Sequence, residues 1–420
     1  RGDAGNIANE NYARELLELF TFGVDNGYDQ RDIEELSRVW TGWTVRFVAP
    51  ADANNVFASS SILLRPGATN QPPRFVDDYL GQWRRTFRAS RHHTGAKHLF
   101  YQYNDAGQRT GPKLYPARFG PRYAGRPYGL TIPGRSGTNG IAEGYQVLEN
   151  LANQPFTQEH LSVKLCRLLV HEEFQHGVHD YGADELTPEA ALIKACMETW
   201  DSTSPKGQLR PVLKTILDSE LFRSRAAAQH KIKTPFEFGV SAVRAFLSTG
   251  TSGAPTAATD GHSLRPLTRR AGNMDLFNRA DPDGFPEDGA PWISAGTLAE
   301  RLRWVQALAM PPNYTIPGQE EVAGNQIDPV ALLRVKLPPA DRKDSAAVAA
   351  YLVGLLFPTE GRANLAAYRE VTRQFLDTAD NGVTPSPFAS LSENGRPSAH
   401  EVRLRGAVAM LLTLPRFQEQ

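Results

Sequence analysis

Apolar side chains near the start of the chain recur at helical spacing and predict an amphipathic helix over residues 9–20. Four of them occupy the i, i+3 and i+4 positions of a buried stripe: Leu16, Leu17, Leu19 and Phe20. Glu10, Arg14 and Glu18 are spaced by four, so they line a second face of the same helix. This helix therefore carries many charged groups directly beside its buried stripe.

Helical spacing returns along most of the chain and predicts a mainly α, multi-helical fold. The further predicted helices cover residues 29–40, 141–152, 157–171, 187–199, 208–218, 234–247, 293–308, 329–333, 345–355, 360–378 and 398–412. Pro155 and Pro188 lie near the start of two of them, where proline is tolerated. Short linkers indicate that consecutive helices pack as neighbours, and we expect two helical lobes.

The helical period is lost between residues 46 and 139, where Gly, Pro, Arg and aromatic residues are frequent. This segment is interpreted as a long irregular insertion that carries short strands or turns of its own. The predicted organisation is therefore N-terminal helices in residues 1–45, an aromatic and Arg-rich insertion in 46–139, and a helical body in 140–420. The body is expected to form one large domain with residues 1–45.

Composition excludes several classes of protein. Lys plus Arg and Asp plus Glu both number 46, so the chain has no net basic field for nucleic acid. No stretch of consecutive apolar residues approaches the roughly 18 to 20 that a membrane-spanning helix needs. The sequence therefore predicts no such helix. The sequence also lacks a G-x-S-x-G elbow, a Walker A sequence, a dinucleotide fingerprint and a kinase signature.

The two cysteines, Cys166 and Cys196, are too few for a disulfide framework. Each lies within an apolar helical pattern, which favours buried free thiols. A single bridge between them remains the alternative if the protein is exported.

The carboxylates of the first predicted helix are candidates for acid/base chemistry. Glu15 and Glu18 are three residues apart beside the buried stripe, so both could face one cavity as a paired-carboxylate site. Alternatively, Glu10, Arg14 and Glu18 form only an ion-pair ladder on the helix surface. A third possibility is a buried polar network with Asn9, Asn11 and Tyr12.

A second candidate lies in the irregular insertion, in His92-His93-Thr94-Gly95-Ala96-Lys97. Imidazole titrates near neutral pH, so a histidine here suits a general base. Adjacent side chains on an extended segment point in opposite directions, and we expect His93 to point inward. Lys97 is expected to neutralise an anionic substrate group or a carboxylate of the first helix. Alternatively, these cations only decorate a surface turn.

Several blocks of the sequence together resemble the bacterial family known as domain of unknown function 1800. The signature is Asn9-Glu10-Asn11-Tyr12-Ala13-Arg14-Glu15-Leu16-Leu17-Glu18-Leu19-Phe20-Thr21-Phe22-Gly23, followed by Thr41-Gly42-Trp43. Further matching blocks are the His92 to Lys97 segment, Lys164-Leu165-Cys166-Arg167, Lys231-Ile232-Lys233-Thr234-Pro235-Phe236-Glu237, Trp292-Ile293-Ser294 and Leu414-Pro415-Arg416-Phe417-Gln418. The resemblance spans nearly the whole chain. Phe20 and Phe285 depart from the His and Trp that are frequent at these places.

The resemblance implies a bacterial, exported protein, so a periplasmic or extracellular location is expected. Family members usually carry another helical segment before the signature, which implies an upstream segment of the same domain or a second protein subunit as a partner. They are often encoded beside a family that looks like alkaline phosphatases or sulfatases.

Two hypotheses of function follow. The first is an extracytoplasmic enzyme that acts by acid/base chemistry on a polysaccharide or another anionic polymer, so that a glycan is its expected partner. Its catalytic groups are Glu10, Glu15, Glu18 and His93, and its substrate-binding groups are Arg14, Tyr12, Trp43 and Lys97. The second is a non-catalytic helical scaffold, or a partner subunit of a sulfatase- or phosphatase-like protein. No motif identifies a substrate or a cofactor, and no metal site is assigned.

Overall fold

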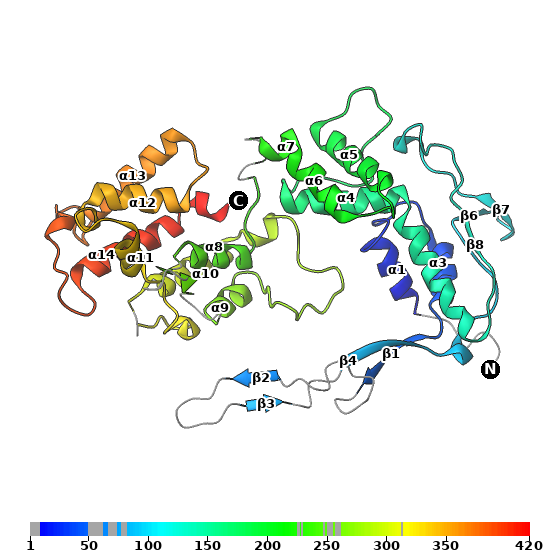
Figure 1. The fold of residues 1–420 in the computed structure, drawn as a ribbon, viewed down its shortest axis with the longest axis horizontal. Coiled ribbons are helices and arrows are strands. Elements are labelled where there is room, and N and C mark those ends of the chain that lie inside the picture. The colour runs from blue at the N-terminus through cyan, green and yellow to red at the C-terminus, as the bar shows by residue number, and fades with distance from the viewer. Residues whose placement is uncertain are drawn as a thin grey trace. The chain divides into compact units, whose positions relative to one another are not determined.

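The computed structural model is mainly helical, as the sequence predicts (Figure 1). It describes residues 9–48, 62–65, 74–76, 82–224, 227, 230–246, 248–249, 255–256, 262–311 and 314–420. These ranges contain 14 helices, and about 51% of the chain is helical. Within them, no helix has the length and apolar character that crossing a membrane requires.

The chain divides into two compact units that are not continuous in sequence. Unit 1 consists of Arg1–Leu169 and Phe174–Leu221, and unit 2 consists of Val170–Glu173 and Phe222–Gln420. The boundaries suggested by the sequence, after residues 45 and 139, both lie inside unit 1. Four residues of unit 2 therefore interrupt the sequence of unit 1.

In its described residues, unit 1 contains six helices and shares a seventh with unit 2, and side chains cap the free N–H groups at the start of three of them. These helices are α1 (Glu10–Glu18), α2 (Gln30–Val39), α3 (Ile141–Ala152), α4 (Pro155–Leu169), α5 (Pro188–Ser202) and α6 (Leu209–Asp218), and α7 (Glu220–Arg223) spans the boundary to unit 2. Asn9 caps α1, and Asp29 forms a capping box with Asp32 at the start of α2. Thr187 caps α5 immediately before Pro188.

The predicted insertion contains short antiparallel ladders of two strands. They pair β1 (Trp43–Val48) with β4 (Gln82–Phe87), β2 (Ile62–Arg65) with β3 (Arg74–Val76), β5 (Lys97–Leu99) with β8 (Leu130–Ile132), and β6 (Tyr101–Tyr103) with β7 (Arg109–Pro112). Residues 49–61, 66–73 and 77–81 of the insertion lie outside the described ranges. Aromatic packing connects this segment to α4: Phe100, between β5 and β6, stacks on Phe22 at 5.1 Å, and Phe22 stacks on Phe156 of α4 at 4.8 Å between ring centroids.

The two cysteines lie on neighbouring helices of unit 1. Cys166 on α4 and Cys196 on α5 are both buried, and neither forms a disulfide, in agreement with the prediction of buried free thiols. A hydrogen bond with Cys196, together with burial, raises the pKa of the Cys166 thiol. Cys166 is therefore a poor nucleophile in this fold.

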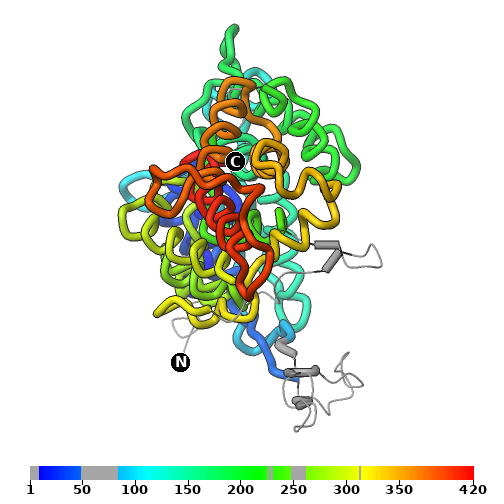
Figure 2. The backbone as a smooth tube through the Cα atoms, turned by 90° about the vertical axis from the view of Figure 1, so that its left-hand side faces the viewer, coloured from blue at the N-terminus to red at the C-terminus, as the bar shows by residue number. Residues whose placement is uncertain are grey.

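Unit 2 is a helical assembly around one apolar core. Its helices are α8 (Pro235–Ala245), α9 (Leu264–Arg270), α10 (Ala295–Ala309), α11 (Pro329–Lys336), α12 (Ser345–Leu356), α13 (Arg362–Leu376) and α14 (Ala399–Leu412), and β9 (Ser248–Thr249) pairs with β10 (Pro255–Thr256). Helices α12 to α14, in orange to red in Figure 2, pack side by side. Trp304 is a fully buried member of this core, and its indole N–H donates to the Ser263 carbonyl at 2.5 Å.

One buried cation of unit 2 should make stability depend on pH. Lys233 is 8% exposed, and burial lowers the pKa of its ammonium to about 8. Between pH 8 and the ordinary lysine pKa of 10.5, the unfolded chain binds more protons at this site than the folded chain does. The free energy of unfolding should therefore rise with pH across this window, by about 3 kcal/mol from this group.

Lys233→Met should remove this rise and should stabilise the protein below pH 8 relative to wild type. This stabilisation of the variant below pH 8 is reduced by about 1 kcal/mol because the Phe417 carbonyl loses the hydrogen bond from Lys233. Urea midpoints of the wild type and variant at pH 7, 8.5 and 10 measure the difference. Lys336→Met, at an exposed position of the same unit, is the control. A wild-type-to-variant difference that does not change with pH would contradict the prediction.

Candidate functional site

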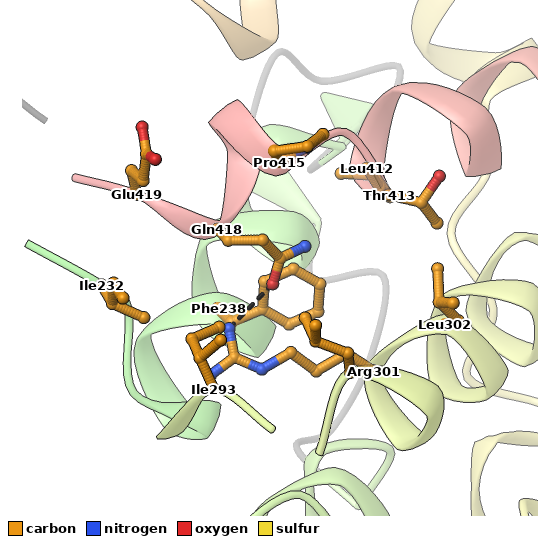
Figure 3. Close-up of a pocket in the computed structure, with 11 residues that line it drawn as sticks. Ile232, Phe238, Ile293, Arg301, Leu302, Leu412, Thr413, Pro415, Gln418 and Glu419 are labelled. Carbon is orange, nitrogen blue, oxygen red and sulfur yellow. Dashed lines mark hydrogen bonds between the residues drawn. The ribbon is translucent and has the colours of Figure 1, made fainter. Parts of the chain in front are cut away.

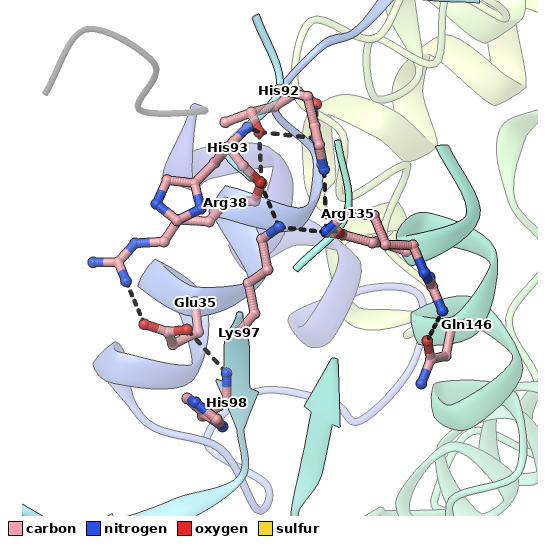
Figure 4. A network of polar contacts seen from close by, with 10 residues as sticks. Glu35, Arg38, His92, His93, Lys97, His98, Arg135 and Gln146 are labelled. Carbon is pink, nitrogen blue, oxygen red and sulfur yellow. Dashed lines mark hydrogen bonds and ion pairs between the residues drawn. The ribbon is translucent and has the colours of Figure 1, made fainter. Parts of the chain in front are cut away.

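A fully buried ion pair joins Lys97 to Glu143 of α3, and Figure 4 shows His92, Lys97 and Arg135 close together at this place. Lys97 Nζ donates to Glu143 Oε2, and His92 Nε2 lies 3.2 Å from the same oxygen. The backbone N–H of Arg135 donates to Glu143 Oε1 at 2.9 Å. The side chains of Lys97, His92 and Glu143 are all 0% exposed, so this charge cluster is sealed from solvent.

Lys97 reaches Glu143 because two acidic residues of α2 hold its strand, β5. Glu35 accepts the backbone N–H of His98 at 3.0 Å, and Asp32 accepts that of Phe100 at 2.5 Å. Lys97 Nζ also donates to the His93 carbonyl at 2.5 Å. Burial lowers the pKa of Lys97, and the attraction of Glu143 opposes this shift.

The Thr41-Gly42-Trp43 block fixes the histidine pair. Thr41 Oγ1 accepts the backbone N–H of His93 at 2.7 Å, and the Thr41 carbonyl lies 2.9 Å from His92 Nδ1. Gly42 has a φ of +81°, and a Cβ atom there would lie 2.8 Å from the Arg88 carbonyl oxygen. The glycine is therefore required by both backbone conformation and space.

The expected orientation of the two histidines is wrong. His92 is buried against Glu143, whereas His93 is only half-buried. The reason is that His92 lies at the end of a short 3₁₀ turn, Ala89–Arg91, which directs its ring toward α3 rather than toward the first helix. His93 instead contributes its backbone groups to the cluster.

The carboxylates of α1 have partners outside the Glu143 cluster. Glu10 accepts a hydrogen bond from the Gln30 amide at 2.9 Å, and Arg14 donates to the same Gln30 at 2.7 Å. Arg14 also pairs with Glu18 at 3.3 Å, which is one step of the surface ladder considered above. Glu15 is half-buried on the same helix. Lys97 takes Glu143 as its carboxylate, rather than one from α1.

The sequence reasoning missed Glu143, although its spacing carries a signal. Glu143, Val147 and Leu151 are four residues apart, and all three are buried on one face of α3. A charged residue on an apolar stripe predicts a buried ion pair. Its partner Lys97 lies 46 residues earlier, beyond the reach of any helical period.

Tyr12 and Trp43 meet in a group of rings that we call the aromatic surface. It consists of Tyr12 on α1, Trp40 after α2, Trp43 on β1, Phe87 on β4 and Tyr145 on α3. Trp40 lies 5.4 Å from both Tyr12 and Trp43, and Trp43 lies 5.6 Å from Tyr145, between ring centroids. Tyr12 is 54% exposed and Tyr145 is 41% exposed, whereas Trp40 is buried beneath them.

Gly144 of α3 makes this packing possible. A Cβ atom at Gly144 would lie 2.7 Å from Trp43 and 2.9 Å from Trp40. Glu143 and Gly144 are adjacent, so one turn of α3 holds both the buried ion pair and the aromatic surface. The charge cluster therefore supports the position of the rings, because α3 is attached to β5 through Glu143.

A second buried carboxylate organises the other end of unit 1. Glu159 on α4 is 0% exposed and binds both terminal nitrogens of Arg118, at 2.7 and 2.8 Å. It also accepts the Tyr181 hydroxyl at 2.8 Å and the Gly177 N–H at 3.0 Å. These contacts fix the loop that leads from α4 to α5. In the described ranges, no three His, Cys, Asp or Glu residues are grouped to hold a metal ion.

Fold and site together define a mainly helical protein of two units, with sealed ion pairs and an aromatic surface in the first. The chain belongs to the family described as "Protein of unknown function (DUF1800)", whose model matches residues 1–419. This match confirms the resemblance noted in the sequence. No curated protein and no solved structure matches the chain.

Proposed function

We propose that unit 1 binds an anionic glycan on the aromatic surface, and that the protein acts as a glycan-binding module. The observation that carries this proposal is the pair of exposed rings, Tyr12 and Tyr145, joined through Trp40 and Trp43. Rings with one open face stack on the apolar C–H faces of sugars, and a hydroxyl at the ring edge adds a hydrogen bond. Exposed aromatic clusters of this kind are typical of binding sites.

The charges beside the rings favour an anionic polymer. Arg85 lies over the Tyr145 ring, with its guanidinium carbon 5.2 Å from the centroid. Arg46 and Arg84 are exposed and paired across the ladder of β1 and β4, but on the face opposite to Trp43, Phe87 and Arg85, so Arg85 is the guanidinium that lies with the rings. Guanidinium groups bind carboxylates and sulfates in a bidentate manner, so acidic sugars fit this surface better than neutral ones.

The proposal gives the Glu143 cluster a structural role. Lys97 and Glu143 are buried and paired with each other, so they have no access to a polymer. The acid/base hypothesis for Glu10, Glu15, Glu18 and His93 is the competing account, and it requires cleavage of the bound glycan. An extracytoplasmic location belongs to the same proposal, because that is where such polymers occur, and fractionation of the native cells tests it.

Substitution of the exposed rings should weaken glycan binding without unfolding the protein. Affinity electrophoresis in gels containing pectate, alginate, a sulfated galactan or neutral xylan measures the dissociation constants. We expect retention by at least one acidic polymer, and a loss of about tenfold, or about 1.4 kcal/mol, for each of Tyr12→Ala and Tyr145→Ala. Arg85→Gln should weaken binding to acidic polymers selectively.

Tyr314→Ala is the matched control, because Tyr314 is 51% exposed in unit 2 and outside the aromatic surface. Equal binding by the wild type and the Tyr145→Ala variant, or no retention by any acidic polymer, would overturn the proposal. Release of reducing ends during the assay would instead support the enzymatic account.

A further inference from the structure

Unit 2 contains a pocket of about 330 Å³ with mainly apolar walls (Figure 3). It lies among α8, α10, the end of α14 and the segment after it. The apolar lining residues are Ile232, Phe238, Ile293, Leu298, Leu302, Leu412 and Pro415. This volume is at the lower end of the range for small-molecule sites, so the pocket suits a small ligand.

Arg301 is the buried cation of this pocket. It is 1% exposed, and its guanidinium carbon lies 5.0 Å from the centre of the Phe238 ring. Nη1 donates to the Gln418 side chain at 2.8 Å, and Nη2 donates to the Lys233 carbonyl at 2.7 Å. Every one of these acceptors is uncharged. Within the described ranges, the Arg301 Nε–H has no hydrogen-bond acceptor.

The positive charge of Arg301 is not neutralised by a carboxylate at ion-pair distance in the described part of the chain. Burial lowers the pKa of its guanidinium to about 10, and the attraction of Glu237 opposes this only in part. Glu419, on the rim of the pocket, is already paired with Arg416 at 2.6 Å. A buried cation without an anion is costly, and a bound anion would relieve that cost.

A second buried cation lies next to the first. Lys233, whose carbonyl holds Arg301, places its ammonium 2.8 Å from the Phe417 carbonyl and 4.1 Å from the centre of the Phe417 ring. The acceptor of its hydrogen bond, the Phe417 carbonyl, is likewise uncharged. Arg301 therefore supplies one buried positive charge to the lining of an apolar pocket, and Lys233, which is not among the lining residues, adds a second charge beside Arg301. This arrangement suits a ligand with a single negative end and an apolar body.

We propose that this pocket binds a small monocarboxylate with an apolar body, with the carboxylate directed at Arg301. The apolar part is held by the aliphatic walls, and the Arg301 Nε–H is the donor left for the anion. If Arg301 served only to connect Gln418 to the Lys233 carbonyl, neither its unpaired Nε–H nor the adjacent cavity would be needed. The proposal concerns unit 2 only and is independent of glycan binding by unit 1.

Isothermal titration of the full chain with octanoate, phenylacetate and the neutral phenylacetamide tests this proposal. We expect saturable binding of at least one carboxylate and at least tenfold weaker binding of the amide. Octanoate and phenylacetate distinguish an aliphatic from an aromatic body. If neither acid binds to the wild type, or if the amide binds as well as the acids, the proposal is wrong.

A variant that fills the pocket tests where the ligand binds and leaves Arg301 unchanged. Leu302 lines the pocket and is 43% exposed, so Leu302→Trp should fold normally and reduce binding at least tenfold. Leu276→Trp is the control, because Leu276 is 38% exposed in unit 2 and lies outside the pocket. Unchanged carboxylate binding in Leu302→Trp would overturn the assignment of this pocket.

Discussion

Replacement of Glu143 by alanine is expected to lower the stability of unit 1 by about 3–5 kcal/mol. The variant leaves the Lys97 ammonium fully buried, with the His93 carbonyl as its remaining acceptor. It also removes the acceptor of the Arg135 N–H and the anion beside His92. The cost arises from an uncompensated buried charge, and is therefore larger than the net worth of the ion pair itself.

Peptide-resolved hydrogen exchange measures this effect best, because it follows the stability of unit 1 separately from that of unit 2. Protection should fall in α2, β5 and α3, whereas the core of unit 2 serves as an internal reference. Glu149→Ala, at an exposed position of the same helix, should leave protection unchanged. Equal protection in Glu143→Ala and Glu149→Ala would contradict the prediction.

The double variant Lys97→Met with Glu143→Leu shows whether the loss of stability comes from the unpaired buried charge or from altered packing around α3. Replacing both partners of a buried pair by apolar residues of similar size is often neutral. We therefore expect the double variant to recover most of the stability that Glu143→Ala loses. If the double variant is as unstable as the single one, packing around α3 rather than the unpaired charge explains the effect.

Glu159→Ala is expected to have a comparable cost, about 3–5 kcal/mol, at the other end of unit 1. Three donors lose their acceptor in this variant: the Arg118 guanidinium, the Tyr181 hydroxyl and the Gly177 N–H. Because two of these donors lie in the loop between α4 and α5, residues 174–187 should lose most of their order.

Limited proteolysis reports this loop directly. Trypsin has no cleavage site between Arg167 and Lys194, so chymotrypsin, which cuts after Phe174 and Tyr181, is the suitable enzyme. Glu159→Ala should be cut there much faster than wild type, and Glu159→Gln, which keeps one acceptor, should be intermediate. Glu198→Ala, exposed on α5, is the control. A loop cut at the wild-type rate in Glu159→Ala would contradict the prediction.

The helices were largely predictable, because their apolar stripes and end signals are local. The spacing predicts residues 141–152 and 345–355, and the structure contains Ile141–Ala152 and Ser345–Leu356. By contrast, α9 was not predicted, since it is one short segment with Pro266 inside it. The local sequence also does not predict the strands β5 and β8, because three-residue strands are too short to show an alternation of apolar and polar residues.

The candidate site was predicted only in part, because its contacts join distant segments. Lys97 was recognised as a functional candidate, but its partner Glu143 is set by the pairing of β5 with α2 and α3. The sequence predicts that Tyr12 and Trp43 both bind substrate, whereas Trp40, the ring that connects them, is only the last residue of the predicted helix 29–40. Periodicity identifies which positions are buried, whereas the choice of partner depends on tertiary structure.

The division of the chain has a consequence for the order of events during synthesis. Val170–Glu173 belongs to unit 2, and Glu172 accepts the N–H of Gly289, which is 117 residues later in the chain, at 2.5 Å. A nascent chain that has emerged as far as Leu221 therefore contains every residue of unit 1. Domains generally fold as units from the N-terminus during translation. Unit 1 can therefore fold before Gly289, the hydrogen-bond partner of Glu172, has been synthesised.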